Sequence, residues 1–267
     1  MRNLLLAVLA VVVVAFAVLV GSYLLRGHPG AKSLRAAAQQ FQQTSTSKPT
    51  PEGFALPAAG VYRASGSGTE RISTPPNSQS DSPVMPVTVS YAAHGCWLWR
   101  IDYNTAHWHE YSFCPDTDRL LLESQRNFVS WDFGLTSVTN LARFTCRPPS
   151  PIVVSSPRPG ERFAFRCAGT NTAVSGRSIS SGPVVIVGLG TLEIGGSPVQ
   201  AVHLTRTQTI SGAQVGRLEE SWWFAASSGL PLEASRNYRL VTESPIGKVT
   251  YTESGSWRLD SLVPISG

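Results

Sequence analysis

Two histidines, His107 and His109, are the residues whose type and spacing first point to chemistry. Residues two apart on a β-strand share a face, so both imidazoles could reach one metal ion. No third ligand has a position that the sequence predicts. The same face would carry five aromatic residues, Trp97, Trp99, Tyr103, Tyr111 and Phe113. This composition favours a packed aromatic face, and we therefore predict no metal site.

Other chemical motifs are incomplete. The run VVIVGLG at residues 184–190 resembles the start of a dinucleotide fingerprint, but Glu193 stands where the third glycine belongs and no helix is expected after it. There is no nucleophile elbow, phosphate-binding loop or carboxylate pair of predictable geometry. We predict a protein without catalytic residues or cofactor, and not an enzyme.

Two arginines occupy equivalent places in a repeated nonapeptide. Residues 120–128 read LLLESQRNF and residues 230–238 read LPLEASRNY, with five identical positions. As strands, both copies place Arg126 or Arg236 on the more apolar face, where an unpaired charge is very costly. Hairpins would set Glu110 across from Arg126 and Glu220 across from Arg236. The arginines are then either structural ion-pair partners or cavity-lining groups that meet an anionic headgroup.

The elements that position these residues are strands. The repeat extends over residues 60–146 and 163–262, which predicts two β units, residues 57–162 and residues 163–267. Gly195-Gly196 marks a hairpin, and further strands are expected near residues 215–225, 230–240 and 248–259. We predict an all-β fold, a long antiparallel meander whose two duplicated units form a curved sheet or a sandwich.

The four cysteines fit two disulfides. If residues 104–106 form the hairpin turn, opposing residues sum to 210, and Cys96 faces Cys114 while Arg100 faces Glu110 and Trp99 faces Tyr111. Cys146 and Cys167 flank a proline-rich loop in the same way. Of three possible pairings we predict Cys96–Cys114 and Cys146–Cys167. Such disulfides are typical of an oxidising compartment.

The N-terminus predicts a membrane anchor. Residues 4–25 contain no charge and would span about 33 Å as a helix, enough for a bilayer core of about 30 Å. The alternative is a cleaved signal peptide, although no typical cleavage site follows. We predict a cytoplasmic tail (1–3), a transmembrane helix (4–25), a juxtamembrane segment with a flexible linker (26–56), and an extracytoplasmic C-terminal domain. The local excess of Lys and Arg after the helix opposes this orientation; the cysteines favour it.

The net charge of +5 does not indicate a nucleic-acid partner. Residues 1–48 carry five basic residues and no acid, whereas the rest of the chain has 17 basic and 17 acidic residues. The predicted domain is therefore neutral, and its expected partners are the membrane and a lipid or envelope protein, with no nucleic acid.

The C-terminal motifs resemble known envelope proteins. With VGLxxLxIGGxPVxAxHL, WWFAASSGLPLEASRNY and WRLDSL, residues 60–262 resemble an actinobacterial family of membrane-anchored envelope proteins without assigned function. Residues 184–260 are more distantly similar to LolA-like carriers, including the LppX and LprG lipoproteins. The second resemblance implies a curved antiparallel sheet that holds acyl chains.

Two functions from different classes follow. The first is a non-enzymatic module at the cell membrane that binds a lipid-like or other hydrophobic ligand. Its expected ligand-binding residues are Trp97, Trp99, Tyr111, Arg126, Trp222 and Arg236. The alternative is a protein-interaction or structural domain of the envelope with no small-molecule ligand. A cavity of several hundred Å³ would favour the first function, and a uniformly packed interior the second.

Overall fold

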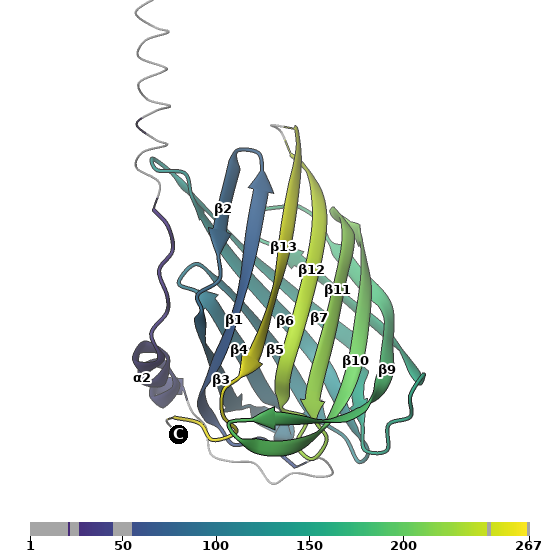
Figure 1. Ribbon diagram of the computed structural model, residues 1–267. Helices are drawn as coiled ribbons and strands as arrows, with labels where there is room; N and C mark the ends of the chain where they lie inside the picture. The colour runs from purple at the N-terminus through teal and green to yellow at the C-terminus, as the bar shows by residue number, and fades with distance from the viewer. Residues whose placement is uncertain (1–20, 22–26, 45–54, 245–246, 266–267) are drawn as a thin grey trace, which may run out of the picture.

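The computed structural model describes residues 21, 27–44, 55–244 and 247–265. They contain helix α2 (Leu34–Thr44), the short 3₁₀ helix η1 (Ala93–Gly95) and thirteen strands (Figure 1). The strands are β1 (Gly60–Ser73), β2 (Pro76–Ser80), β3 (Val84–Tyr91), β4 (Trp97–Asn104), β5 (His107–Pro115), β6 (Arg119–Asp132), β7 (Ser137–Val154), β8 (Arg162–Asn171), β9 (Ser178–Ile194), β10 (Ser197–Gly212), β11 (Gln214–Ala225), β12 (Pro231–Ser244) and β13 (Gly247–Leu259).

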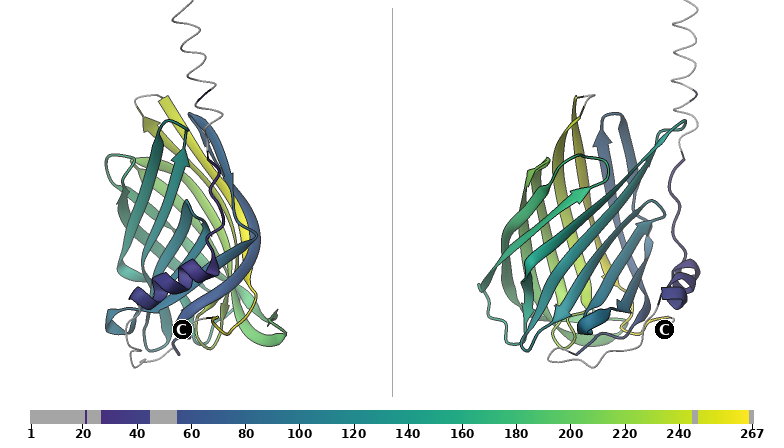
Figure 2. Two further views of the ribbon diagram at one scale, coloured as in Figure 1. Left: turned by 90° about the vertical axis from the view of Figure 1, so that its left-hand side faces the viewer. Right: turned by 180° about the vertical axis from the view of Figure 1, so that it is seen from behind.

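The strands close into one antiparallel barrel. From β3 to β13 each strand pairs with the next along the chain, and β13 pairs with β1 from Ala64 to Ile72. Twelve strands complete the ring, while β2 pairs with the far half of β1 (Figures 1 and 2). The all-β meander is confirmed. The expected curved sheet or sandwich is wrong, because pairing of the first and last strands removes the two open edges.

Small residues allow this closure. A Cβ atom on Gly66 would lie 2.1 Å from the backbone oxygen of Ser256, and one on Gly255 would lie 2.8 Å from the Cα of Gly68. Larger side chains at these positions would therefore push β1 and β13 apart. Glycine at these positions therefore allows β1 and β13 to pair along the seam that closes the barrel. Because the two strands are far apart in the sequence, short-range sequence patterns do not reveal this requirement.

The predicted hairpins and disulfides are present. Trp97 pairs with Phe113 and Arg100 with Glu110, as the proposed sum of 210 requires. Cys96 is bonded to Cys114 and Cys146 to Cys167. Gly195 and Gly196 form the β9–β10 turn with φ angles of 59° and 77°, a conformation that favours glycine. The three C-terminal strands also lie where they were expected.

Helix α2 packs on the outside of the barrel (Figure 2). Ala37 and Phe41 are buried against Val61 of β1, and Lys32 Nζ lies 2.9 Å from Asp102 Oδ2. A part of the predicted juxtamembrane segment is therefore docked on the barrel wall. Most of the predicted linker, residues 45–54, lies outside the described residues, as does the predicted anchor at residues 4–25 apart from Gly21.

Within the described part of the chain, no helix has the length and apolar character needed to cross a membrane.

Both predicted β units contribute to the same barrel. Residues 57–162 supply β1–β7, and residues 163–267 supply the remaining strands, with one boundary residue, Arg162, at the start of β8. Their buried side chains form one shared hydrophobic core that extends from Tyr62 to Leu259. The internal duplication stays a prediction from the sequence.

Candidate functional site

One end of the barrel interior, which we call the aromatic end, is filled by side chains. The ring centroid of Trp99 lies 5.0 Å from that of Trp257, 5.7 Å from Trp222 and 5.8 Å from Tyr111. These rings meet because alternate residues of β4, β5, β11 and β13 point inward. A gap lined by Tyr111 and Trp222 has a volume of only about 10 Å³, space for at most one water molecule. The aromatic end therefore has no room for a ligand.

The other end, the cavity end, contains a cavity of about 440 Å³. In Figure 1 this is the upper end, near the end of β12 and the turns that follow β1 and β6. Its walls are mainly apolar and come from β5–β7, β10–β13 and the β1–β2 turn. The apolar wall includes Ile72, Val129, Trp131, Phe144, Ile210, Leu218, Leu240 and Val249. Cavities of 300–1,000 Å³ with apolar walls and a few polar groups are typical of small-molecule sites.

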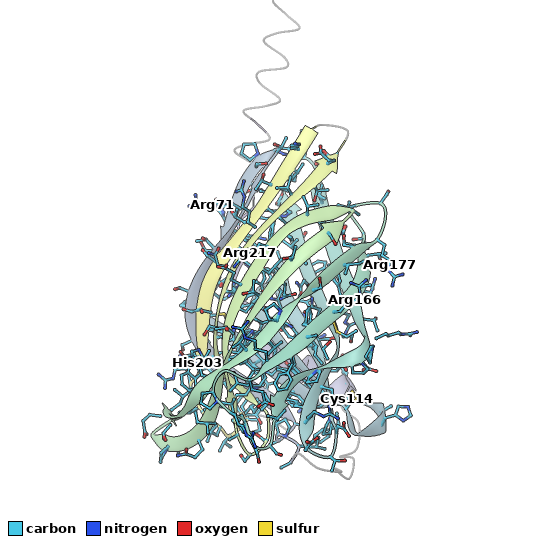
Figure 3. The ribbon with its side chains drawn as sticks, turned by 90° about the vertical axis from the view of Figure 1, so that its right-hand side faces the viewer. Arg71, Cys114, Arg166, Arg177, His203 and Arg217 are labelled. Atoms are coloured by element: carbon cyan, nitrogen blue, oxygen red, sulfur yellow. A yellow bond between two sulfur atoms is a disulfide. The ribbon has the colours of Figure 1, made fainter. Side chains whose placement is uncertain are left out.

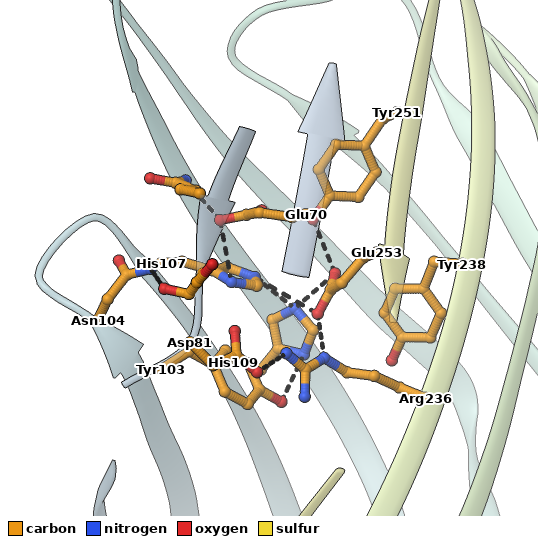
Figure 4. Close-up of polar contacts among 12 residues, drawn as sticks. Glu70, Asp81, Tyr103, Asn104, His107, His109, Arg236, Tyr238, Tyr251 and Glu253 are labelled. Atoms are coloured by element: carbon orange, nitrogen blue, oxygen red, sulfur yellow. Dashed lines mark hydrogen bonds and ion pairs between the residues drawn. The ribbon is translucent and has the colours of Figure 1, made fainter. Parts of the chain in front are cut away.

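A layer of buried charges separates the two ends (Figure 4). At its centre Arg236 of β12 forms ion pairs with Glu253 of β13 and, at 2.6 Å, with Asp81. The Arg236 guanidinium also lies 3.7 Å from the ring centroid of Tyr103. All three charged side chains are at most 4% exposed. Ion pairing and the aromatic contact compensate for the loss of water around these charges.

A second buried ion pair lies beside the first. Arg206 of β10 pairs with Glu220 of β11, and Gln208 Nε2 donates to Glu220 Oε2 at 2.9 Å. The Tyr111 hydroxyl donates to the same carboxylate at 3.3 Å. The Tyr238 hydroxyl donates to it as well. Burial raises the pKa of Glu220, but the guanidinium and the hydroxyl donors outweigh it and hold the pKa below its usual value. The ion pair and these hydrogen bonds therefore stabilise the ionised form of the buried Glu220 carboxylate.

The two histidines lie on the floor of the cavity. His107 Nε2 and His109 Nε2 are 3.2 Å apart, and the Glu253 carboxylate lies 3.6 Å from the first and 3.7 Å from the second. Burial lowers the pKa of both imidazoles, for His109 to about 4, so both are neutral near pH 7. Burial also opposes the ionisation of Glu253, but the nearby His109 and Arg236 hold its pKa at about 2.

Glu70 lies directly behind the floor. Its Oε1 lies 3.2 Å from His107 Nδ1, and the Tyr251 hydroxyl lies 2.8 Å from its Oε2. Burial and the negative charge of Glu253 raise the pKa of Glu70 well above its usual value. The floor carboxylate of Glu253 therefore stays ionised, whereas the carboxyl group of Glu70 behind it resists ionisation.

The six residues predicted to bind a ligand do not line the cavity. The four aromatic ones, Trp97, Trp99, Tyr111 and Trp222, belong to the packed aromatic end. Arg236 lies in the charged layer, below His109 and Tyr238. Arg126 lies on the outer surface with its side chain 42% exposed. The predicted aromatic face is real, but it is an interior packing surface.

A β-bulge explains the position of Arg126. The register of β6 shifts between Leu122 and Ser124, so Leu122 points inward and Arg126 outward. The predicted pairing with Glu110 is confirmed, on the outside of the barrel. The register of β12 shifts only near its start, between Pro231 and Glu233, and Leu232, Ala234 and Arg236 all remain on the inner face.

Glu220 faces Arg236 in the strand register, as predicted, but the expected ion pair between them is replaced by others. The carboxylate of Glu220 turns to Arg206, which lies opposite it on β10. Arg236 instead meets Glu253 and Asp81. Sequence reasoning missed these partners. Alternation in LTRTQT at residues 204–209 could have placed Arg206 inside, whereas Asp81 and Glu253 meet only through barrel closure.

No protein-family model matches the chain, and no curated protein matches it. Among solved structures the chain is similar to the hypothetical lipoprotein YmcC from Escherichia coli K12, with 12% identity and a TM-score of 0.33. The match covers 85% of this chain and 97% of that chain. A likeness of this size carries no argument about fold or function, so the resemblances to envelope proteins and LolA-like carriers stay predictions.

Proposed function

We propose that this protein is a non-enzymatic binding module of the cell envelope that holds a lipid-like or other hydrophobic molecule in its barrel. The observation that carries the proposal is the cavity of about 440 Å³ above the charged floor. The gap at the aromatic end is only about 10 Å³, so the cavity is a feature of the other end of the barrel.

The residues that line the cavity favour an amphiphilic ligand. Its apolar wall residues, such as Leu218 and Leu240, can bury a hydrocarbon part, which is stabilised by about 25 cal/mol for each Å² removed from water. The floor offers hydroxyl, imidazole and carboxylate groups from Tyr251, His107 and Glu253 to a polar part of the ligand. A ligand with one apolar and one polar end matches both surfaces.

The proposed location is the outer side of the cell membrane. Two disulfides support an oxidising compartment, and residues 4–25 are proposed to anchor the barrel. The membrane-bound protein should begin at or next to Met1 and resist extraction by alkali. An N-terminus beyond Leu25 would contradict the anchor and indicate a cleaved signal.

Native mass spectrometry of the purified protein tests the ligand. We expect a co-purified hydrophobic molecule in the unmodified chain and its loss in Leu218→Trp, because the larger ring would occupy the cavity. Val215→Trp is the matched control, since Val215 lies on the same strand but is 51% exposed on the outside. The control should retain the ligand.

Two outcomes contradict the proposal. One is a ligand-free chain that also fails to bind a fluorescent fatty acid in titration. The other is equal retention of ligand by both tryptophan variants. Either result would favour the alternative, a protein-interaction domain without a small-molecule ligand.

A further inference from the structure

His107, His109 and Glu253 converge on one point of the cavity floor (Figure 4). The histidines are two residues apart on the inner face of β5, and Glu253 reaches them from β13. Both Nε2 atoms face each other and the carboxylate, at 3.2 Å, 3.6 Å and 3.7 Å. One ligand atom from each residue lies within 4.8 Å of the other two. Two imidazoles and a carboxylate are a common ligand set for a transition metal.

The distances fit a tetrahedral ion. Zinc binds imidazole nitrogen at about 2.0–2.1 Å, so two such nitrogens at a tetrahedral angle lie about 3.3 Å apart. The separation of the two Nε2 atoms, 3.2 Å, matches this value. The Glu253 oxygens are only a few tenths of an ångström further away than a ligand oxygen would be. The two distances belong to different oxygens, Oε1 and Oε2, so the Glu253 carboxylate would have to rotate to bring one oxygen to the ion.

The surrounding groups orient these ligands. His107 Nδ1 lies 3.2 Å from Glu70 Oε1, and His109 Nδ1 lies 3.4 Å from the Tyr103 hydroxyl. In the tautomer with the proton on Nδ1, each Nε2 has a lone pair for a metal ion; among the described residues His107 Nδ1 makes no hydrogen bond, and Glu70 Oε1 lies near enough to accept one after a small change of angle. Tyr251 holds Glu253 by a hydrogen bond of 2.7 Å. A carboxylate or hydroxyl behind each ligand is the usual outer arrangement of a metal site.

The local charge also favours a cation. Glu70, Asp81 and Glu253 form one contact group with a single guanidinium, that of Arg236. The neighbouring Glu220 is already neutralised by Arg206. If all three carboxyl groups were ionised, they would exceed the one guanidinium by two negative charges, which one divalent ion would neutralise. In a buried layer such an excess requires either protons or a bound cation.

We propose that His107, His109 and Glu253 bind one divalent transition-metal ion, with zinc as the best match. All three residues line the cavity, so the remaining coordination position faces the cavity and is open to water or to a ligand oxygen. The site goes beyond the proposed function, because it requires no hydrophobic ligand.

The test uses the full-length chain, purified without a histidine tag and treated with a chelator. Isothermal titration with Zn²⁺ should show one equivalent per chain, and Co²⁺ should give the intense visible absorption of tetrahedral cobalt. Outer groups of metal sites change affinity about 10- to 100-fold, so we expect at least ~100-fold weaker binding in His107→Gln/His109→Gln. Glu70→Gln should weaken binding less, by about 10-fold.

His203→Gln is the matched control, because His203 lies on the outer surface, stacked on Trp223 at 4.4 Å (Figure 3). It should bind one equivalent of Zn²⁺ with unchanged affinity. If the double variant does not fold, Glu253→Gln and the Co²⁺ spectrum of the unmodified chain decide. No stoichiometric binding by the unmodified chain, or a tetrahedral spectrum that survives in any ligand variant, overturns the proposal.

Discussion

The aromatic end and the cavity end of the barrel share the same strands but differ in their side chains. On β12, Leu232 is fully buried in the aromatic end, Arg236 lies in the charged layer, and Leu240 borders the cavity. The same strand runs through all three levels. At the aromatic end tryptophans from three strands meet at the centre, whereas shorter aliphatic side chains line the walls at the other end. In a barrel of this width, side-chain volume decides whether the interior is a core or a cavity.

The largest expected effect concerns the layer between the two ends. Arg236→Met leaves Asp81 and Glu253 as buried carboxylates without their guanidinium, so the free energy of unfolding should fall by about 3–5 kcal/mol. Urea denaturation followed by circular dichroism measures this loss. Arg217→Met on the outside, where the side chain is 65% exposed, is the control and should be nearly neutral. A similar stability of the two variants would mean that the charged layer is solvated.

Two leucine-to-alanine substitutions on β12 test the difference in packing between the two ends. Leu232→Ala opens a new cavity in the aromatic end and should cost about 3 kcal/mol. Leu240→Ala only enlarges an existing cavity and should cost about 1 kcal/mol, since its side chain has fewer neighbours to lose. Equal losses in urea denaturation would contradict the difference in packing between the two ends.

A smaller effect is expected from acid. The pKa of Glu220 is lower in the folded than in the unfolded chain, so its contribution to stability is complete above the unfolded value and is lost as the pH falls through the folded value. Unfolding free energies measured between pH 7 and pH 3 should therefore fall less steeply in Glu220→Gln than in the unmodified chain. Parallel pH profiles would show that Glu220 is not held in its ionised form.

The smallest effect should come from the outer arginine of the repeated nonapeptide. Arg126 pairs with Glu110 and lies 6.0 Å from the ring centroid of Trp108, but its side chain is 42% exposed. Arg126→Met should therefore reduce stability by less than ~1 kcal/mol. A loss as large as that of Arg236→Met would show that the two copies have equivalent surroundings.

These two arginines also show where sequence reasoning succeeds. Alternation placed Arg236 inside, and local hairpin arithmetic gave the Cys96–Cys114 pair, because the partners lie close in sequence. The same alternation failed for Arg126, because the bulge in β6 depends on its pairing with β7 and leaves no glycine as a signal. The histidines had no visible third partner, since Glu253 lies 144 residues after His109. Contacts that depend on barrel closure could not be predicted from local periodicity.

The seam between β1 and β13 has a consequence for biosynthesis. Ile72 pairs with Tyr251 and Ala64 with Leu259, contacts between the first and last strands that span nearly the whole barrel sequence. The ring cannot close before the last strand has left the ribosome, and closing so long a loop makes folding slow. The contact of Glu253 with His107 forms only at that moment. Until then both sheet edges stay unpaired, and unpaired strand edges of an incompletely folded chain favour aggregation.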